Sequence, residues 1–414
     1  MTATRNVLVL IISVMILQLA GGLIGMLTPL GLEAMGSGPQ TIGVIAAFNA
    51  AGYMIGAWTA PRALGLIGNI RLFAAASAVG AVAVLALSLW HDATFWALMR
   101  ILQGIAFAYM FTSIESWLGE AVPEQSRGNV MGIYHTGAKL SLMLGPFFVA
   151  GLGPLDSRAY IWTALFLTLA ILPVCVTRQK EPAPPDRTPM PLMELGRMAP
   201  AAVVGVLLAG VVNTGTLALL PVYFQDFSLA GGGTAAVAIA GAAAWLGGLV
   251  LQWPAGVLSD RIERRLVIAG LCAMAGVAAL LIAIFGRAVG EIGVIVLLTV
   301  WGAGALSFYG LCVAHAIDRT PRGRVPQVMS GLLFVWAAGS IVGPLMSGFA
   351  MRMADRVGLF GLAGVLLLVL AILMVVRVRQ RAAPSEAQQE EWKPIQPTPL
   401  ASVELDPRNP ELDT

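Results

Sequence analysis

Ten consecutive residues in the second half of the chain mark how it is organised: Gly256-Val257-Leu258-Ser259-Asp260-Arg261-Ile262-Glu263-Arg264-Arg265. Five of the ten are charged, and they stand between the apolar runs 234–258 and 266–286. A helix needs about 20 apolar residues to cross the hydrocarbon core of a bilayer, and each run supplies that length. The stretch therefore predicts a short charged turn at a membrane surface, between two spanning helices.

Long apolar runs separated by short polar breaks recur along the whole chain. Twelve runs are long enough to span a bilayer, at approximately 7–30, 41–63, 71–90, 94–119, 127–151, 158–177, 199–223, 234–258, 266–286, 290–316, 325–350 and 357–377. None of them shows the strict alternation of a barrel strand. We therefore predict an all-α membrane protein with twelve transmembrane helices.

The composition excludes several classes of protein. Of the 414 residues, 58% are hydrophobic and 11% are charged, against roughly 45–50% and 25% in soluble proteins, so a water-soluble enzyme is excluded. The first run lacks a signal-peptide cleavage site and is read as a retained span. Cys175, Cys272 and Cys312 show neither a disulfide framework nor metal-ligand spacing. A net charge of +3 without a basic cluster indicates no nucleic-acid partner.

Polar segments divide the chain and set its orientation. The break 178–198, which contains five prolines, separates an N-terminal six-helix bundle at 1–177 from a C-terminal bundle at 199–377. The segment 378–414 is rich in Gln, Glu and Pro and is expected to be a disordered tail. With the N-terminus inside, 19 of the 25 Lys and Arg residues lie in inner segments, which predicts that both termini are cytoplasmic.

The two halves resemble each other at a nearly constant spacing. The matched landmarks are Gly56 with Gly256 at an offset of 200, Gly104 with Gly302, Glu120 with Asp318 and Gly145-Pro146 with Gly343-Pro344 at 198, and Pro29 with Pro221 at 192. Such agreement indicates a duplicated six-helix unit, so we expect two pseudo-symmetric bundles with a site near the midplane where they meet.

Two motifs resemble those of a known family. The stretch from Gly256 to Arg265 resembles the Gly-x-x-x-Asp-Arg-x-Gly-Arg-Arg loop of the major facilitator superfamily, with Glu263 where that family prefers Gly. Arg100-Ile-Leu-Gln-Gly104-Ile-Ala-Phe-Ala108 is similar to the family's Arg-x-x-x-Gly-x-x-x-Ala signature. The resemblance covers about residues 7–377 and implies the major facilitator fold, in which two bundles rock about a central site.

The charged loop is a candidate cytoplasmic gate. We expect Asp260 to cap a neighbouring helix N-terminus, and Arg261 and Arg264 to engage Asp318 at another helix end. In the first half, Ala60-Pro61-Arg62 lacks the acid, which predicts a weaker latch. The alternative is that all these charges only follow the positive-inside rule. The predicted gate consists of Gly256, Asp260, Arg261, Arg264, Arg265, Asp318, Glu120 and Arg127, with Arg62 as a further possibility in the first half.

Ionisable residues inside the spans are candidates for the transport chemistry. Arg100 and Glu115 share one face of the fourth run, and His135 and Lys139 share one face of the fifth. In proton-coupled relatives the arginine has been tied to proton transfer, and a charge at the bilayer centre costs at least about 2.5–3.5 kcal/mol. We predict proton coupling by Glu115 with His135 or Arg100, and solute binding by Lys139. The alternative is that these pairs only hold helices together.

Position in the family's fold adds further substrate-binding candidates. They are Gln18, Asn49, Tyr53, Asn213, Tyr309 and Trp336, with Thr214, Gln252 and Trp253 beside them. The glycine-proline pairs of the fifth and eleventh runs resemble an antiporter motif, but close helix packing explains them equally well.

The predicted function is secondary active transport by alternating access. No phosphate-binding loop or cofactor motif is present, so we expect no enzyme, no cofactor and no metal. The solute is expected to be a small organic molecule moved with protons across the cytoplasmic (inner) membrane by a monomer, and Lys139 favours an anionic group on it. The alternatives are a proton-independent facilitator or efflux pump for amphipathic compounds, and a non-transporting sensor or assembly factor.

Overall fold

The structure is a computed structural model that describes residues 2–122, 127–176, 191–286, 288–321, 324–380 and 392. Every element in this part of the chain is a helix. In the first half these are α1 (Thr2–Ala34), α2 (Pro39–Ile67), α3 (Asn69–Leu89), α4 (Ala93–Ala121), α5 (Arg127–Leu144), η2 (Gly145–Val149), α6 (Ser157–Leu169) and α7 (Ile171–Val176). In the second half they are α8 (Leu192–Met198), α9 (Pro200–Ala209), η3 (Gly210–Thr214), α10 (Gly215–Phe224), η4 (Leu229–Gly231), α11 (Gly233–Arg261), α12 (Arg264–Phe285), α13 (Gly290–Ala305), α14 (Phe308–Ile317) and α15 (Val325–Gln380).

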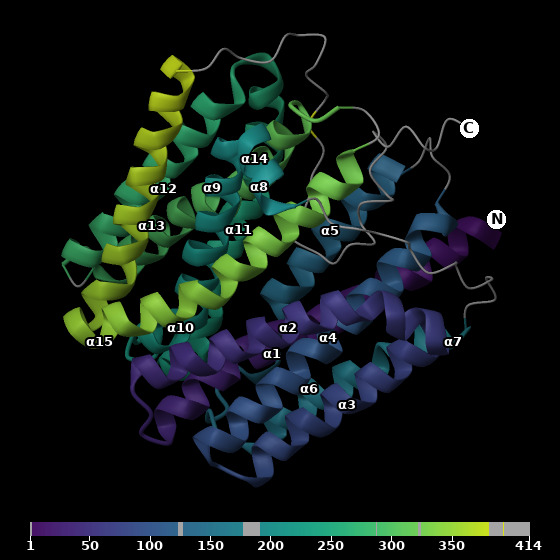
Figure 1. Cartoon of the computed structure of the whole chain (residues 1–414). Coiled ribbons are helices and arrows are strands. Elements are labelled where there is room, and N and C mark those ends of the chain that lie inside the picture. Colours follow the sequence, from purple (N-terminus) through teal and green to yellow (C-terminus); the bar gives the residue numbers. More distant parts are fainter. Residues whose placement is uncertain are drawn as a thin grey trace. The chain divides into compact units, whose positions relative to one another are not determined.

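The helices confirm the predicted all-α membrane fold. Ten helical stretches of the described chain are long and apolar enough to cross a bilayer. One of them, α15, contains two of the predicted spans, because Ala354 and Asp355 leave helical geometry and Asp355 has a φ of 51°. Figure 1 shows the resulting sharp bend between the two arms of α15. The continuous stretch α5–η2 supplies the remaining predicted span, which Lys139 makes less apolar.

The chain forms two compact units. Among the described residues, the first comprises residues 2–37, 45–122 and 127–176, and the second comprises residues 38–44, 191–286, 288–321, 324–380 and 392. In the first unit α4 packs on α3, and α1 packs on α5 and α6. In the second, α15 packs on α12, α9 and α10, and α13 packs on α11 and α12. Residues 178–190 of the predicted linker, and the predicted tail apart from 378–380 and Trp392, lie outside the described residues.

Glycines place the fourth helix of each half against its neighbour. A Cβ on Gly104 would collide with the carbonyl oxygen of Asn49 on α2, and a Cβ on Gly302 of α13 would collide with that of Ala244 on α11. Lipid provides no hydrophobic drive for helices to associate, so small residues that let backbones approach closely determine which helices pack. Gly104 and Gly302 are the predicted repeat partners, and they make equivalent contacts in the two units.

The glycine-proline pairs make a second equivalent contact. Gly145 lies against the backbone carbonyl of Leu19 on α1, and Gly343 lies against that of Val211 on η3. Leu19 and Val211 are 192 residues apart, the same spacing as Pro29 and Pro221 within the same two helical stretches. Two independent glycine contacts therefore show the internal repeat in three dimensions.

Substitution of Gly104 by alanine should destabilise the first unit. The added methyl group has no room at the Asn49 carbonyl, which is backbone and cannot rotate away, and overpacking of this kind costs about 1–3 kcal/mol. Thermal unfolding of the purified protein in detergent should show a lower Tm for Gly104→Ala. Gly25→Ala on α1 is the matched control, because its Cβ would meet no atom within 4 Å. Equal melting of the two variants would contradict the role of Gly104.

Candidate functional site

Arg100 is buried on α4 with a polar neighbour, and no acidic residue of the described chain binds it. The residue is 8% exposed, and its Nη1 donates to Oε1 of Gln103 at 2.6 Å. Within the described part of the chain, Nε of Arg100 and Nε2 of Gln103 have no hydrogen-bond acceptor. Asn49 binds the backbone carbonyl of Arg100 at 3.0 Å, so this predicted substrate residue joins α2 to α4. Gln103 was not among the predicted residues, although its i+3 spacing from Arg100 is a readable signal.

Glu115 lies at the other end of the same helix. It is fully buried, and Oε1 accepts a hydrogen bond from the Tyr134 hydroxyl of α5 at 3.0 Å. The Tyr134 ring lies edge-on to the ring of His135, with centroids 5.0 Å apart. Fifteen residues at 1.5 Å each place Arg100 about 22 Å from Glu115 along α4. At this separation Arg100 and Glu115 do not contact each other directly, and the prediction that they act together in proton coupling stays a prediction. Tyr134, which was not among the predicted residues, contacts Glu115.

Lys139 follows His135 by one turn on α5. Both residues are buried, at 7% and 4% exposure. Gly137, between them, packs against Met15 of α1, which holds this part of α5 close to α1. Two buried Lys or Arg side chains, Arg100 and Lys139, therefore lie on different helices among the described residues of the first unit.

The seventh span contains a local change of helix type. Residues 210–214 form a π-helical turn, η3, that carries the predicted residues Asn213 and Thr214. Thr214 donates to the carbonyls of Gly210 at 2.5 Å and Ser340 at 3.3 Å. The buried Oδ1 of Asn213 has no donor among the described residues. Such turns are frequent at functional sites. Neither hydropathy nor motif spacing distinguishes a π-helical turn from an ordinary helix.

The other predicted substrate residues occupy varied environments. Gln18 of α1 and Tyr53 of α2 are half-buried, as is Trp336 of α15, whose carbonyl accepts from Ser340. Tyr309 is buried on α14. Trp253 is 69% exposed on α11 and fits a membrane-interface anchor better than a binding residue.

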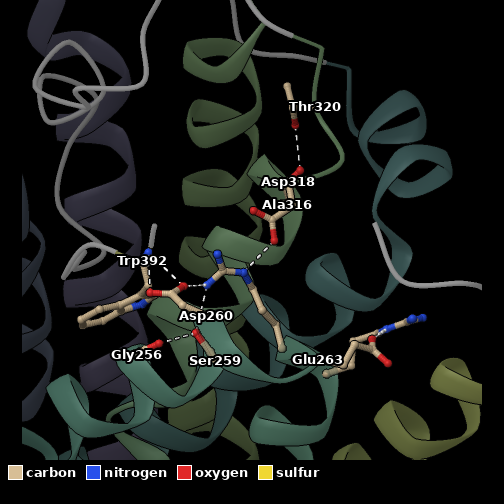
Figure 2. A network of polar contacts seen from close by, with 10 residues as sticks. Gly256, Ser259, Asp260, Glu263, Ala316, Asp318, Thr320 and Trp392 are labelled. Carbon is tan, nitrogen blue, oxygen red and sulfur yellow. Dashed lines mark hydrogen bonds and ion pairs between the residues drawn. The ribbon is translucent and has the colours of Figure 1, made fainter. Parts of the chain in front are cut away.

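The predicted gate forms a buried ion-pair network in the second unit (Figure 2). Arg264, 2% exposed at its side chain, lies between two carboxylates: its Nε donates to Oδ2 of Asp318 at 2.7 Å and its Nη1 contacts Oδ1 of Asp260 at 2.9 Å. Nη1 also donates to the Ser259 hydroxyl at 2.9 Å, which in turn donates to the Gly256 carbonyl at 2.7 Å. The network links the end of α11, the start of α12 and the end of α14.

Two details of the gate differ from the prediction. Asp260 does not cap a helix among the described residues, because its carboxylate is taken up by Arg264 and by the backbone N–H of Trp392. Arg261 is exposed and has no described acidic partner, so Arg264 alone of the pair engages Asp318. In the first half Arg62 stacks over Trp58 at 5.6 Å. The side chains of Glu120 and Arg127 lie outside the described part of the structure.

The second unit contains further ion pairs. Arg265 pairs with Glu263, the residue that replaces the family's glycine, and its Nη1 donates to the carbonyl of Arg377 at 2.7 Å. This second contact joins α12 to the last turns of α15. On the surface, Arg324 pairs with Glu194 of α8 at 2.6 Å. The hydrogen bond from Arg324 lowers the pKa of Glu194 below its ordinary value.

Asp318→Asn should destabilise the protein strongly. The substitution leaves the buried Arg264 with one carboxylate in place of two, and removing one partner of a buried pair costs about 3–5 kcal/mol. Because Arg264 keeps its contact with Asp260, we expect a loss of stability at the lower end of that range. Thermal unfolding in detergent measures the loss.

The matched control is Glu194→Gln, which breaks an ion pair whose side chains are 45% and 38% exposed. Because exposed pairs contribute little, its Tm should change only slightly. A similar Tm for both variants would show that Arg264 does not depend on Asp318.

The sequence matches a known family along most of its length. The family model described as Major Facilitator Superfamily matches residues 10–307 and 236–408. An uncharacterised MFS-type transporter of Enterobacter sp. (strain 638) is 25% identical over 366 residues, which cover 85% of this chain and 90% of the relative. The uncharacterised MFS-type transporter YcaD of Escherichia coli (strain SE11) is 24% identical over 361 residues, with the same shares covered.

Solved transporter structures have the same fold. A bacterial homologue of the human lysosomal transporter Spinster, in an inward-facing unoccupied conformation, matches with a TM-score of 0.73 at 14% identity, covering 95% of this chain and 99% of that one. The nucleoside transporter NupG matches with a TM-score of 0.71 at 13% identity, covering 91% and 100%. With two helical units, a matching internal repeat and a family match over almost the whole chain, this multi-pass membrane protein belongs to the major facilitator superfamily.

Proposed function

We propose that the chain is a proton-coupled secondary transporter for a small organic solute that carries an anionic group. It moves the solute across the cytoplasmic (inner) membrane by alternating access, with both termini on the cytoplasmic side. Glu115 carries the coupling proton, and Arg100 and Lys139 provide the positive charge for the solute. The network of Arg264 with Asp260 and Asp318 acts as the gate on the cytoplasmic side.

The burial of Glu115 is the observation that carries proton coupling. A carboxyl group with no exposed surface, on a membrane-spanning helix, is costly to keep ionised. Its Oε1 accepts a hydrogen bond from the neutral hydroxyl of Tyr134. A change in access during the transport cycle would therefore change the occupancy of the proton on Glu115, which is the requirement for coupling. Of the neighbouring groups, His135 has the side chain best suited to exchange that proton near neutral pH.

The donors around Arg100 support the anionic solute. Arg100 and Gln103 together present two buried N–H groups, Nε and Nε2, that no described acceptor satisfies. A buried donor without an acceptor is unfavourable, so a carboxylate or phosphate oxygen of a solute would stabilise this site. Arg100 also lacks an acidic partner in the described structure, so its charge is available to an anion.

A thermal-shift screen on the purified protein tests the solute class. The probes are small carboxylates and phosphates, each paired with its neutral amide or alcohol analogue. We expect stabilisation by an anionic member and not by its neutral partner, and loss of that stabilisation in Arg100→Gln. Arg158→Gln, which removes an arginine that is 71% exposed, should keep it. Stabilisation by the neutral members alone would overturn the anionic class.

Glu115→Gln tests proton coupling once a solute is found. Glutamine can still bond Tyr134 but cannot release a proton, so proteoliposomes should lose solute accumulation driven by a pH gradient. Exchange of labelled solute at equal pH, which needs no net proton movement, should continue. Asp156→Asn, at an exposed helix cap, should retain both activities.

Two results would contradict proton coupling and support a proton-independent facilitator. One is solute accumulation that persists in Glu115→Gln, and the other is uptake by the unaltered protein without acidification of the lumen. Absence of exchange with every solute that binds would instead support a non-transporting sensor.

A further inference from the structure

A residue far beyond the last membrane helix is buried against the gate. Trp392 follows the end of α15 at Gln380 by twelve positions, yet it is 5% exposed. Its backbone N–H donates to both carboxylate oxygens of Asp260, at 3.1 Å each. Figure 2 shows the indole beside the end of α11, with the backbone N–H of Trp392 directed at Asp260. This contact lies wholly within the second unit.

Gly256 provides the surface on which the indole packs. A Cβ at this position would collide with three carbon atoms of the Trp392 ring. Any other residue would therefore displace the indole, since the ring is rigid and its backbone is held at Asp260. The indole Nε1 has no acceptor among the described residues. The side chain is thus held by shape and apolar contact, and the backbone by the hydrogen bonds.

The tail and the gate share one carboxylate. Asp260 binds Trp392 on one side and Arg264 on the other, and Arg264 continues to Asp318 and Ser259. The backbone donor adds two hydrogen bonds to a carboxylate that is 26% exposed. A contact that stabilises Asp260 in this position therefore also favours the arrangement in which Arg264 joins the end of α11, the start of α12 and the end of α14.

We propose that the C-terminal tail is an internal regulatory ligand of the gate, with Trp392 docked in the site formed by Gly256 and Asp260. A ligand that binds one arrangement of a protein shifts the equilibrium toward it. The docked tail therefore holds the Arg264 network closed, and release of Trp392 makes it easier to open. Docking itself is independent of the transported solute; its effect on turnover rests on the proposed gating role.

Chymotrypsin reports docking directly in the full-length protein. Trp392 is the only aromatic residue after Phe360, so cleavage between Trp392 and Lys393 is a specific signal, and cleavage after Leu400 is the internal reference. We expect Gly256→Ala to raise the rate after Trp392 several-fold relative to the reference, because proteolysis follows the population of the open form. The control is Gly241→Ala on the same helix, because a Cβ at Gly241 would meet no atom within 4 Å. This variant should not change the cleavage rate after Trp392. Equal rates in the two variants would overturn docking.

Hydrogen–deuterium exchange provides a second test that leaves α11 unaltered. Trp392→Ala should increase exchange over Gly256–Glu263, whereas Trp392→Phe, which keeps a flat ring and the backbone donor, should preserve most of the protection. Unchanged exchange in Trp392→Ala would also overturn docking.

For regulation, Trp392→Ala should raise solute exchange in proteoliposomes by about fivefold or more, the lower range for an allosteric coupling. Docking with an unchanged exchange rate would show that the tail is a structural contact and not a regulator. Absence of exchange in both the unaltered protein and the variant would count against the proposed transport function, while the cleavage and deuterium results would still decide docking.

Discussion

Close approach of helix backbones at glycine is the constraint on which the rest of this structure depends. Within lipid, apolar side chains gain nothing by leaving one apolar surface for another, so helix pairs are selected by how closely their backbones fit. Gly104 and Gly145 in the first unit, and Gly302 and Gly343 in the second, each lie against a backbone carbonyl of the partner helix. These contacts position the functional side chains: Arg100 is one turn before Gly104 on the same helix.

On this scaffold the buried charges fall into two kinds. Arg264 is surrounded by Asp260 and Asp318, and its charge is compensated by the protein itself. Arg100 has an amide neighbour, Gln103, and its Nε has no acceptor in the part of the chain that the structure describes. In the proposed function, the compensated Arg264 belongs to a gate that opens and closes. In the same proposal, Arg100, which has no acidic partner among the described residues, binds the anionic group of the solute.

Much of the fold could be predicted from the sequence because hydropathy and repeats are local or periodic signals. The twelve spans follow from run length, and the Arg264–Asp318 pair follows from the motif and its spacing. The sequence did not reveal the contact of Tyr134 with Glu115, the π-helical turn Gly210–Thr214, or the position of Trp392 beside Asp260. Tyr134 in particular looks like an ordinary aromatic residue until α4 and α5 are brought together. Asp260 was expected to be a helix cap for the same reason, since one of its two donor residues, Trp392, lies 132 positions away in the sequence.

Gly56 and Gly256, which match in the sequence at an offset of 200, make different contacts in the two halves. In the first unit a Cβ on Gly56 would collide with Ala108 and Ile105 of α4, so this glycine serves helix packing. In the second unit the corresponding packing on α13 is done by Gly247 and Gly248, and Gly256 is left facing Trp392. The first half also lacks the acid that Asp260 supplies, having Pro61 and Arg62 nearby. Both elements of the tail site, a surface without a side chain and a carboxylate beside it, are therefore present in one half alone, so a single tail can act on a single loop.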